Sequence, residues 1–240
     1  MRAFHNDSRV RDFFLARVRA HKAAGQITKG AYWRDGLGCA VGCTIHSSSH
    51  LSYPGILGIP VILAHLEDRI FEGLPLPAAQ DWPEKFLSVI PVGADLSQIW
   101  AEFVVWRLVD AKDGVIKYAL SEGERQVIWQ IAQLHKERCR DNSAFRAALM
   151  ATHEPMGAKE MPAIRAQDAA TLAAEQAVFA ADAAASADAV AASVVVVAAA
   201  DAAASAAIVA GETPSAAKEA AYVSMADKVL ELLAAAPVKK

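Results

Sequence analysis

The chain has 240 residues, a formal net charge of -3 and a pI near 6.2, so a general electrostatic attraction for nucleic acid is not expected. Its start, MRAFHNDSRVRDFF, lacks the apolar run of a secretory signal. The 3 cysteines, an odd number, fit a reducing compartment better than a disulfide framework. We therefore predict a cytoplasmic protein that has no membrane span and no nucleic-acid partner.

Amino-acid composition changes sharply along the chain. Residues 1–150 contain every Trp and every Cys, whereas residues 163–236 are dominated by Ala. Alanine loses the least side-chain freedom when it enters a helix, so the second part is predicted to be helical. The predicted fold is all-α, with an irregular N-terminal part of short helices over 1–150, a linker over 151–162, and long Ala-rich helices over 163–240. Those long helices are expected to form a hairpin or a bundle.

The first predicted helix runs from about Ser8 to Ala24. Asp7 or Ser8 can cap its first turn, and Gly25 can adopt the left-handed conformation that ends it. Residues 26–38 contain 3 glycines beside an aromatic pair, which predicts a loop or a short hairpin.

Proline positions shape the prediction for the middle of the chain. Pro60 suits the first turn of a helix that Gly73 would end. The prolines between residues 75 and 91 are predicted to cut that stretch into short helical pieces, with Asp81 capping the piece that holds Trp82.

Three further helices follow in the prediction. Asp95 or Ser97 can cap a strongly apolar helix that ends near Leu108. Ser121 and Glu124 have the spacing of a capping box, which begins a helix to about residue 140. The last helix is predicted over about 214–235. Residues 163–210 are predicted as one helix or as two that fold back, and their Asp and Ser residues favour a buried helix over a membrane span.

The most concentrated reactive side chains are Cys39, Cys43, His46 and His50. On one continuous helix their offsets of four, three and four would place all of them on one face. Thiolate and imidazole are the ligands that zinc takes in a tetrahedral site. Three interpretations remain open: buried core cysteines, a metal site, or a reactive thiol with a histidine base.

Two other groups are candidates for function. His65, Glu67 and Asp68 share one helical neighbourhood and could form an acid/base set, although an ion-paired outer helix face explains the same pattern. His21 is predicted to stand alone and partly exposed. Aromatic side chains in the loops could anchor a protein interface, and the candidates are Tyr32, Trp33 and Tyr53.

Several sequence blocks resemble those of uncharacterised bacterial and phage-associated helical proteins, which share them in this order. The blocks are GCAVGCTIH, LGIPVILAHLEDRIFEGLP, WPEKFL and IPVGADLSQIW, followed by an Ala-rich tail ending ADKVLELL. The resemblance covers about residues 15–115 and, more loosely, the tail. It implies no particular activity, so no functional residue is carried over. The tail is also similar in composition to that of some immunity proteins of bacterial toxin systems.

The sequence contains no phosphate loop, dinucleotide-binding glycine pattern, HExxH or GxSxG motif. We therefore predict a non-catalytic helical protein that binds a protein partner, or itself, as an inhibitor, immunity or anti-defence factor. No cofactor is predicted under that interpretation. The alternative is a metal-binding or cysteine-dependent enzyme that uses Cys39, Cys43, His46 and His50, with zinc as its metal.

Overall fold

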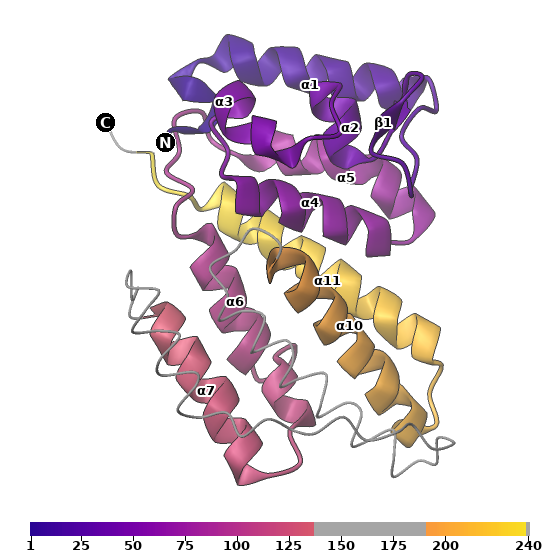
Figure 1. Cartoon of the computed structure of the whole chain (residues 1–240), viewed down its shortest axis with the longest axis vertical. Helices are drawn as coiled ribbons and strands as arrows, with labels where there is room; N and C mark the ends of the chain where they lie inside the picture. The colour runs from indigo at the N-terminus through magenta and orange to yellow at the C-terminus, as the bar shows by residue number, and fades with distance from the viewer. Residues whose placement is uncertain (137–190, 239–240) are drawn as a thin grey trace. The chain divides into compact units, whose positions relative to one another are not determined.

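The computed structural model of the chain describes residues 1–136 and 191–238 (Figure 1). Helices dominate both ranges, and the sheet within them is a single two-stranded hairpin. The predicted all-α fold class is therefore confirmed. Within these ranges, no helix combines the length and the apolarity that crossing a bilayer requires.

The chain divides into two compact units. The first unit comprises Met1–Trp100 together with Tyr222–Lys240, and the second comprises Ala101–Ala221. The predicted linker over 151–162 lies outside the described residues. So does the start of the Ala-rich part, and with it the choice between one helix and two over 163–210.

The first unit begins with a 3-10 helix, η1 (Ala3–Asn6), and the long helix α1 (Ser8–Ala23). Asp7 caps α1 as predicted, because its side chain accepts a hydrogen bond from the Arg9 amide at 2.9 Å. The predicted stop is also present, since Gly25 adopts a φ of 65° directly after the helix. Local capping signals therefore fixed both ends of this helix.

A hairpin and a short helix follow α1. Strands β1 (Trp33–Arg34) and β2 (Leu37–Gly38) pair antiparallel, and α2 (Ala40–Ile45) begins directly after them. The hairpin packs tightly on α2, because a Cβ added at Gly42 would lie only 1.5 Å from the Tyr32 carbonyl oxygen. Glycine at this position is what allows the two segments to touch.

The next elements are η2 (His50–Ser52), α3 (Tyr53–Leu57), α4 (Val61–Gly73) and α5 (Leu76–Val89). The predicted division of residues 75–91 into short pieces is wrong, because α5 continues through Pro83. Pro83 removes one helical hydrogen bond. Burial of neighbouring Trp82 and Phe86 favours the continuous helix, since both side chains then face the core.

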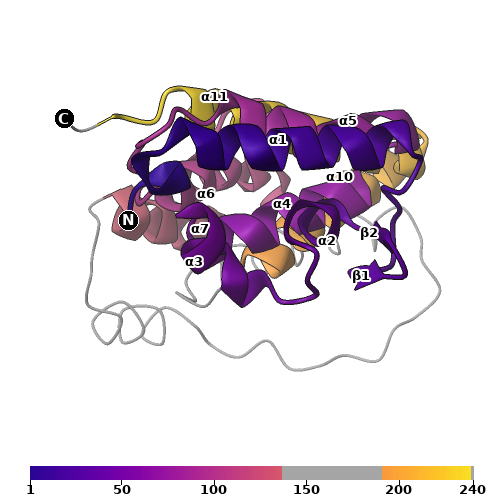
Figure 2. The same ribbon diagram turned by 90° about the horizontal axis from the view of Figure 1, so that it is seen from above.

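Asp81 lies inside α5 and does not cap it, which corrects a second prediction. Its carboxylate instead lies 2.9 Å from Lys22 Nζ on α1. The helices α1 and α5 run side by side (Figure 2). α2 packs against both of them, whereas α4 packs against α5 and α2. The centre of this unit is apolar, with buried side chains that include Val18, Leu63, Leu66 and Phe86.

The second unit contains most of α6 (Ile99–Val109), η3 (Val115–Tyr118), α7 (Glu122–Lys136) and α10 (Ala191–Ala210). The capping box of α7 is confirmed, because the Glu124 amide donates to Ser121 Oγ at 3.2 Å while Glu124 Oε2 accepts from the Ser121 amide at 2.8 Å.

The last helix, α11 (Pro214–Ala234), agrees closely with its predicted range. Its first eight residues belong to the second unit and the remainder to the first. A short turn at residues 211–213 joins it to α10, and Lys218 forms an ion pair with Asp201 across that turn. α10 and the start of α11 form a helical hairpin (Figure 1), which is one of the two arrangements expected for the Ala-rich part. The fold-back expected within 163–210 lies mostly outside the described residues.

Candidate functional site

The predicted Cys/His set does not lie on one continuous helix. α2 ends at Ile45, and His46 is its left-handed C-cap with a φ of 53°. The serine run that follows separates His46 from His50, which lies in η2. The condition of one continuous helix is therefore not met, and the two histidines belong to different clusters.

Both cysteines of the set are buried and serve the local backbone. Cys39 is the N-cap of α2, and its Sγ accepts a hydrogen bond from the Gly42 amide at 3.4 Å. The Cys43 thiol donates to the Gly38 carbonyl at 3.3 Å. Burial raises the pKa of Cys43 to about 11, and burial together with the charge of Asp68 raises the pKa of Cys39 further. Both side chains are therefore protonated thiols at neutral pH, whereas a nucleophilic or metal-binding cysteine is a thiolate.

His46 forms the first cluster with His21 of α1. Their Nε2 atoms lie 2.7 Å apart, and His21 Nδ1 lies 2.6 Å from Gln26 Oε1. The Trp33 ring stacks on His46, with centroids 4.3 Å apart and planes inclined by 9°. One imidazole must donate and the other accept in the short contact, so at least one of the two rings is neutral.

The environment of this pair favours the neutral form of His46. The side chain is exposed at its outer edge. Partial burial of its ring nevertheless lowers the pKa of His46, and the positive charges of Arg17 and His21 lower it further. Arg17 is held nearby because its guanidinium donates to the Thr44 carbonyl at 3.0 Å. His21 itself is buried, which corrects the prediction that it is partly exposed. No sequence signal could reveal the pair, because its members are 25 positions apart.

The second cluster combines His50 with the predicted acid/base set. His50 Nε2 lies 3.3 Å from Asp68 Oδ2, close enough for a charge pair but without the angle of a hydrogen bond. The His65 ring stacks on His50 at a centroid distance of 4.4 Å. The Tyr32 ring meets His50 edge-on at 5.5 Å. The fold thus joins residues that the sequence separates into three candidate groups.

Glu67 lies one position before Asp68 in α4 and is completely buried. The Tyr53 hydroxyl donates to Glu67 Oε2 at 2.6 Å, and Trp82 Nε1 donates to the Glu67 backbone carbonyl at 2.9 Å. Burial raises the pKa of Glu67 to about 8, although the Tyr53 hydrogen bond opposes the change. At neutral pH the carboxyl group is therefore mainly protonated, and the interior avoids an unpaired charge.

The aromatic candidates separate by burial. Tyr53 is fully buried, so the structure corrects its proposed role as an exposed anchor. Trp33 is half-buried against His46. Tyr32 alone of the three is strongly exposed, with 56% of its surface accessible. Among the residues that the structure describes, no group of three His, Cys, Asp or Glu side chains is arranged to hold a metal ion.

Comparison with known proteins adds no homologue to this description, because no protein-family model, curated protein or solved structure matches the chain.

Proposed function

We propose that the protein is a non-catalytic helical protein that binds a protein partner through its β1–β2 hairpin and the segment that follows α2. We call this surface the hairpin surface and define it by the exposed side chains of Tyr32, Arg34, Leu37 and Leu51. The observation that carries the proposal is Tyr32, which is 56% exposed although its ring is held edge-on against His50. A large aromatic side chain in a fixed, exposed position is typical of interface hot spots.

The hairpin surface is held rigidly from beneath. The Cys39 amide donates to the Ala31 carbonyl at 2.7 Å, and the Gly38 amide donates to the Gln26 carbonyl at 3.1 Å. Lys29 Nζ donates to the Glu72 carbonyl at 3.0 Å, which ties the hairpin to the end of α4. Because these bonds order the loop before any partner arrives, binding would lose little conformational entropy.

The side chains of the hairpin surface suit an interface. Tyrosine and arginine are enriched among residues that dominate binding energy, and Arg34 is almost fully exposed beside Tyr32. Leu51 follows His50 directly and is 74% exposed. We therefore expect a partner with an apolar pocket for Tyr32 and a polar rim. Self-association is the alternative arrangement for the same surface.

Two other interpretations have weaker support. The Ala-rich helix α10 buries most of its described side chains, so it offers little surface to a partner apart from its last turn. A cysteine-dependent enzyme needs an accessible thiolate, whereas Cys39 and Cys43 are buried thiols. These observations favour the hairpin surface over both.

The proposal is tested by quantitative capture of partners from native lysate with the wild-type chain, Tyr32→Ala and Leu51→Ala. Sedimentation of the purified chain over a range of concentrations tests self-association in parallel. We expect Tyr32→Ala to weaken binding about 30-fold or more, the usual loss at a hot spot. Leu51→Ala should weaken it less, because rim residues contribute less.

The matched control is Leu120→Ala, which removes another exposed leucine, in the second unit. It should bind like the wild-type chain. The proposal fails if the chain is monomeric and captures nothing, or if Tyr32→Ala binds as well as the wild type.

A further inference from the structure

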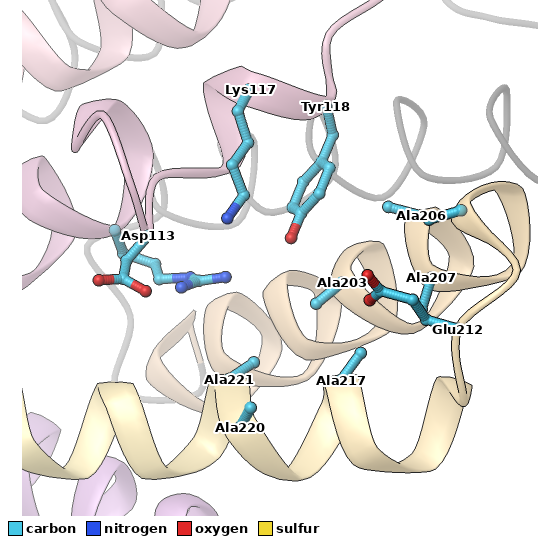
Figure 3. A pocket seen from close by; sticks show the side chains of 12 residues that line it. Asp113, Lys117, Tyr118, Ala203, Ala206, Ala207, Glu212, Ala217, Ala220 and Ala221 are labelled. Carbon is cyan, nitrogen blue, oxygen red and sulfur yellow. The ribbon is translucent and has the colours of Figure 1, made fainter.

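A pocket of about 380 Å³ lies in the second unit, apart from the candidate site described above. Side chains of α6 and η3 line one part of it, and alanines of α10 and α11 line another (Figure 3). Its volume is at the small end of the range for small-molecule sites. Lys117 and Tyr118 reach from η3 toward the alanine wall, as the same view shows.

Arg107 supplies the main charge of this pocket. Its side chain is only 2% exposed, and Nη2 donates to the Ala199 carbonyl at 3.2 Å. Its Nε has no hydrogen-bond partner among the described residues. Burial lowers the pKa of Arg107 to about 10, although Tyr118, Asp113 and Asp110 oppose the change. The guanidinium is therefore charged at neutral pH, with one buried donor unused, and such a group requires an explanation.

Lys117 places a second cation at the pocket. Its ammonium donates to the Lys112 carbonyl and lies 5.0 Å from the centre of the Tyr118 ring. Two acidic residues, Asp113 and Glu212, also line the pocket. Glu212 is exposed, so water solvates it, whereas Arg107 is buried. Asp113 is half-buried, and its negative charge opposes the lowering of the pKa of both Arg107 and Lys117. Two cations therefore face one half-buried carboxylate, so the net charge of the inner lining is positive.

The opposite wall is apolar because its side chains are methyl groups. Ala203, Ala207 and Ala221 are buried there, and Ala217 extends the same wall from α11 (Figure 3). Larger side chains at these positions would fill the space. The arrangement therefore combines a buried guanidinium and a neighbouring exposed ammonium with an apolar surface that leaves room for a short hydrocarbon chain.

We propose that this pocket binds a small organic anion, whose carboxylate or phosphate group lies between Arg107 and Lys117 and whose hydrocarbon part packs against the alanine wall. Arginine suits this task because its planar guanidinium presents several donors to the oxygens of either group. The proposal is independent of the hairpin surface, so each can fail without the other.

The test is an NMR titration of the full chain with three probes: butanoate, hexanoate and inorganic phosphate. We expect saturable binding with shifts concentrated at pocket residues. Hexanoate should bind up to about 15-fold more tightly than butanoate, because two additional methylene groups leave water. Tight phosphate binding with weak carboxylate binding would identify phosphate as the preferred anionic group.

Two variants with matched controls separate the parts of the pocket. Lys117→Gln should weaken the binding of all three probes about tenfold. Lys112→Gln, which removes an exposed charge outside the pocket lining, should leave their binding unchanged.

Ala217→Leu tests the apolar part of the pocket. It should weaken the binding of hexanoate more than that of phosphate, because the added side chain fills the apolar part. Ala216→Leu, at an exposed neighbouring position outside the lining, should behave like the wild type. Lys117 is itself exposed, so its replacement does not endanger folding.

Three results would overturn the proposal. The first is the absence of saturable binding for every probe at a Kd below about 10 mM, because binding weaker than this limit is not specific. The second is equal loss in Lys117→Gln and Lys112→Gln, which would indicate general attraction of anions to surface charge. The third is equal affinity for butanoate and hexanoate, since the alanine wall would then contribute nothing.

Discussion

Tyr53 donates its hydroxyl hydrogen to Glu67 Oε2 at 2.6 Å, and both side chains are fully buried in the first unit. The bond joins α3 to α4 across 14 positions of sequence. Because water is excluded, the carboxyl group is stable there mainly in its neutral form, and its pKa rises to about 8. This buried acid makes the stability of the first unit depend on pH.

Glu67→Gln should stabilise the protein at alkaline pH. The folded-state pKa of Glu67, about 8, is above the ordinary value of 4.5, so folding opposes ionisation. The stabilising contribution of the neutral acid is complete below pH 4.5 and is lost as the pH rises toward 8. Relative to Glu67→Gln, the wild type should lose up to about 1.4 kcal/mol of unfolding free energy per pH unit in that window. Urea unfolding followed by tryptophan fluorescence measures this, since Trp82 bonds to the Glu67 backbone.

The control for this prediction is Glu219→Gln, because Glu219 is exposed on α11. Its stability should follow that of the wild type at every pH. The prediction is contradicted if the stability curves of the wild type and of Glu67→Gln are parallel from pH 5 to 8. Glu67 would then not titrate in the predicted window.

His46 should give pH dependence of the opposite sign. The folded-state pKa of His46 is lowered from 6.5 by burial, and by the charges of Arg17 and His21. The unfolded chain therefore binds this proton more readily, and stability is lost as the pH falls below 6.5 toward the folded pKa. His46→Gln should flatten this acid limb of the stability curve.

Titration of the His46 ring by NMR measures the same effect directly, and a midpoint at or above the value of an unfolded peptide would contradict it. Stability measurements on this pair belong in the Glu67→Gln background. There the opposite contribution of the buried acid is removed, and the difference in slope between chains with and without His46→Gln reports His46.

Gly42→Ala should destabilise the protein by about 2 kcal/mol or more, because the new methyl group would overlap the Tyr32 carbonyl 1.5 Å away. The hairpin must move for the variant to fold, so binding through Tyr32 should weaken as well. Thermal or urea unfolding measures the loss of stability.

The control is Gly55→Ala in α3, where a Cβ meets nothing within 4 Å. It should be neutral or slightly stabilising, and equal costs for the two variants would disprove the close contact.

Cys39 and Cys43 should react slowly with thiol reagents in the folded state. Both are buried, and the pKa of each thiol is raised, chiefly by burial. Labelling should be at least about 100-fold slower than in urea, because it requires local opening. The measurement needs the Cys139→Ser variant, since Cys139 lies outside the described residues and would add its own signal. Rapid native labelling at either position would return the reactive-thiol interpretation to consideration.

Local features were predictable because the residues that produce them are close in sequence. The Asp7 cap of α1, the Ser121–Glu124 capping box and the bounds of α11 all depend on neighbours within a few positions. Pro83 does not follow its local sequence preference. Its local tendency to end a helix is outweighed by burial of the apolar side chains around it, which depends on what packs against α5.

The sequence by itself determined the all-α class, the ends of α1 and α11, the start of α7 and which side chains could carry chemistry. Only the tertiary structure decided which of those side chains meet. It separates His46 from His50, joins His50 to Asp68 across 18 positions, buries Tyr53 and leaves Tyr32 exposed. The physical reason is that long-range pairing is set by the packing of whole helices. An apolar pattern shows which face of a helix is buried, but not which other helix covers it.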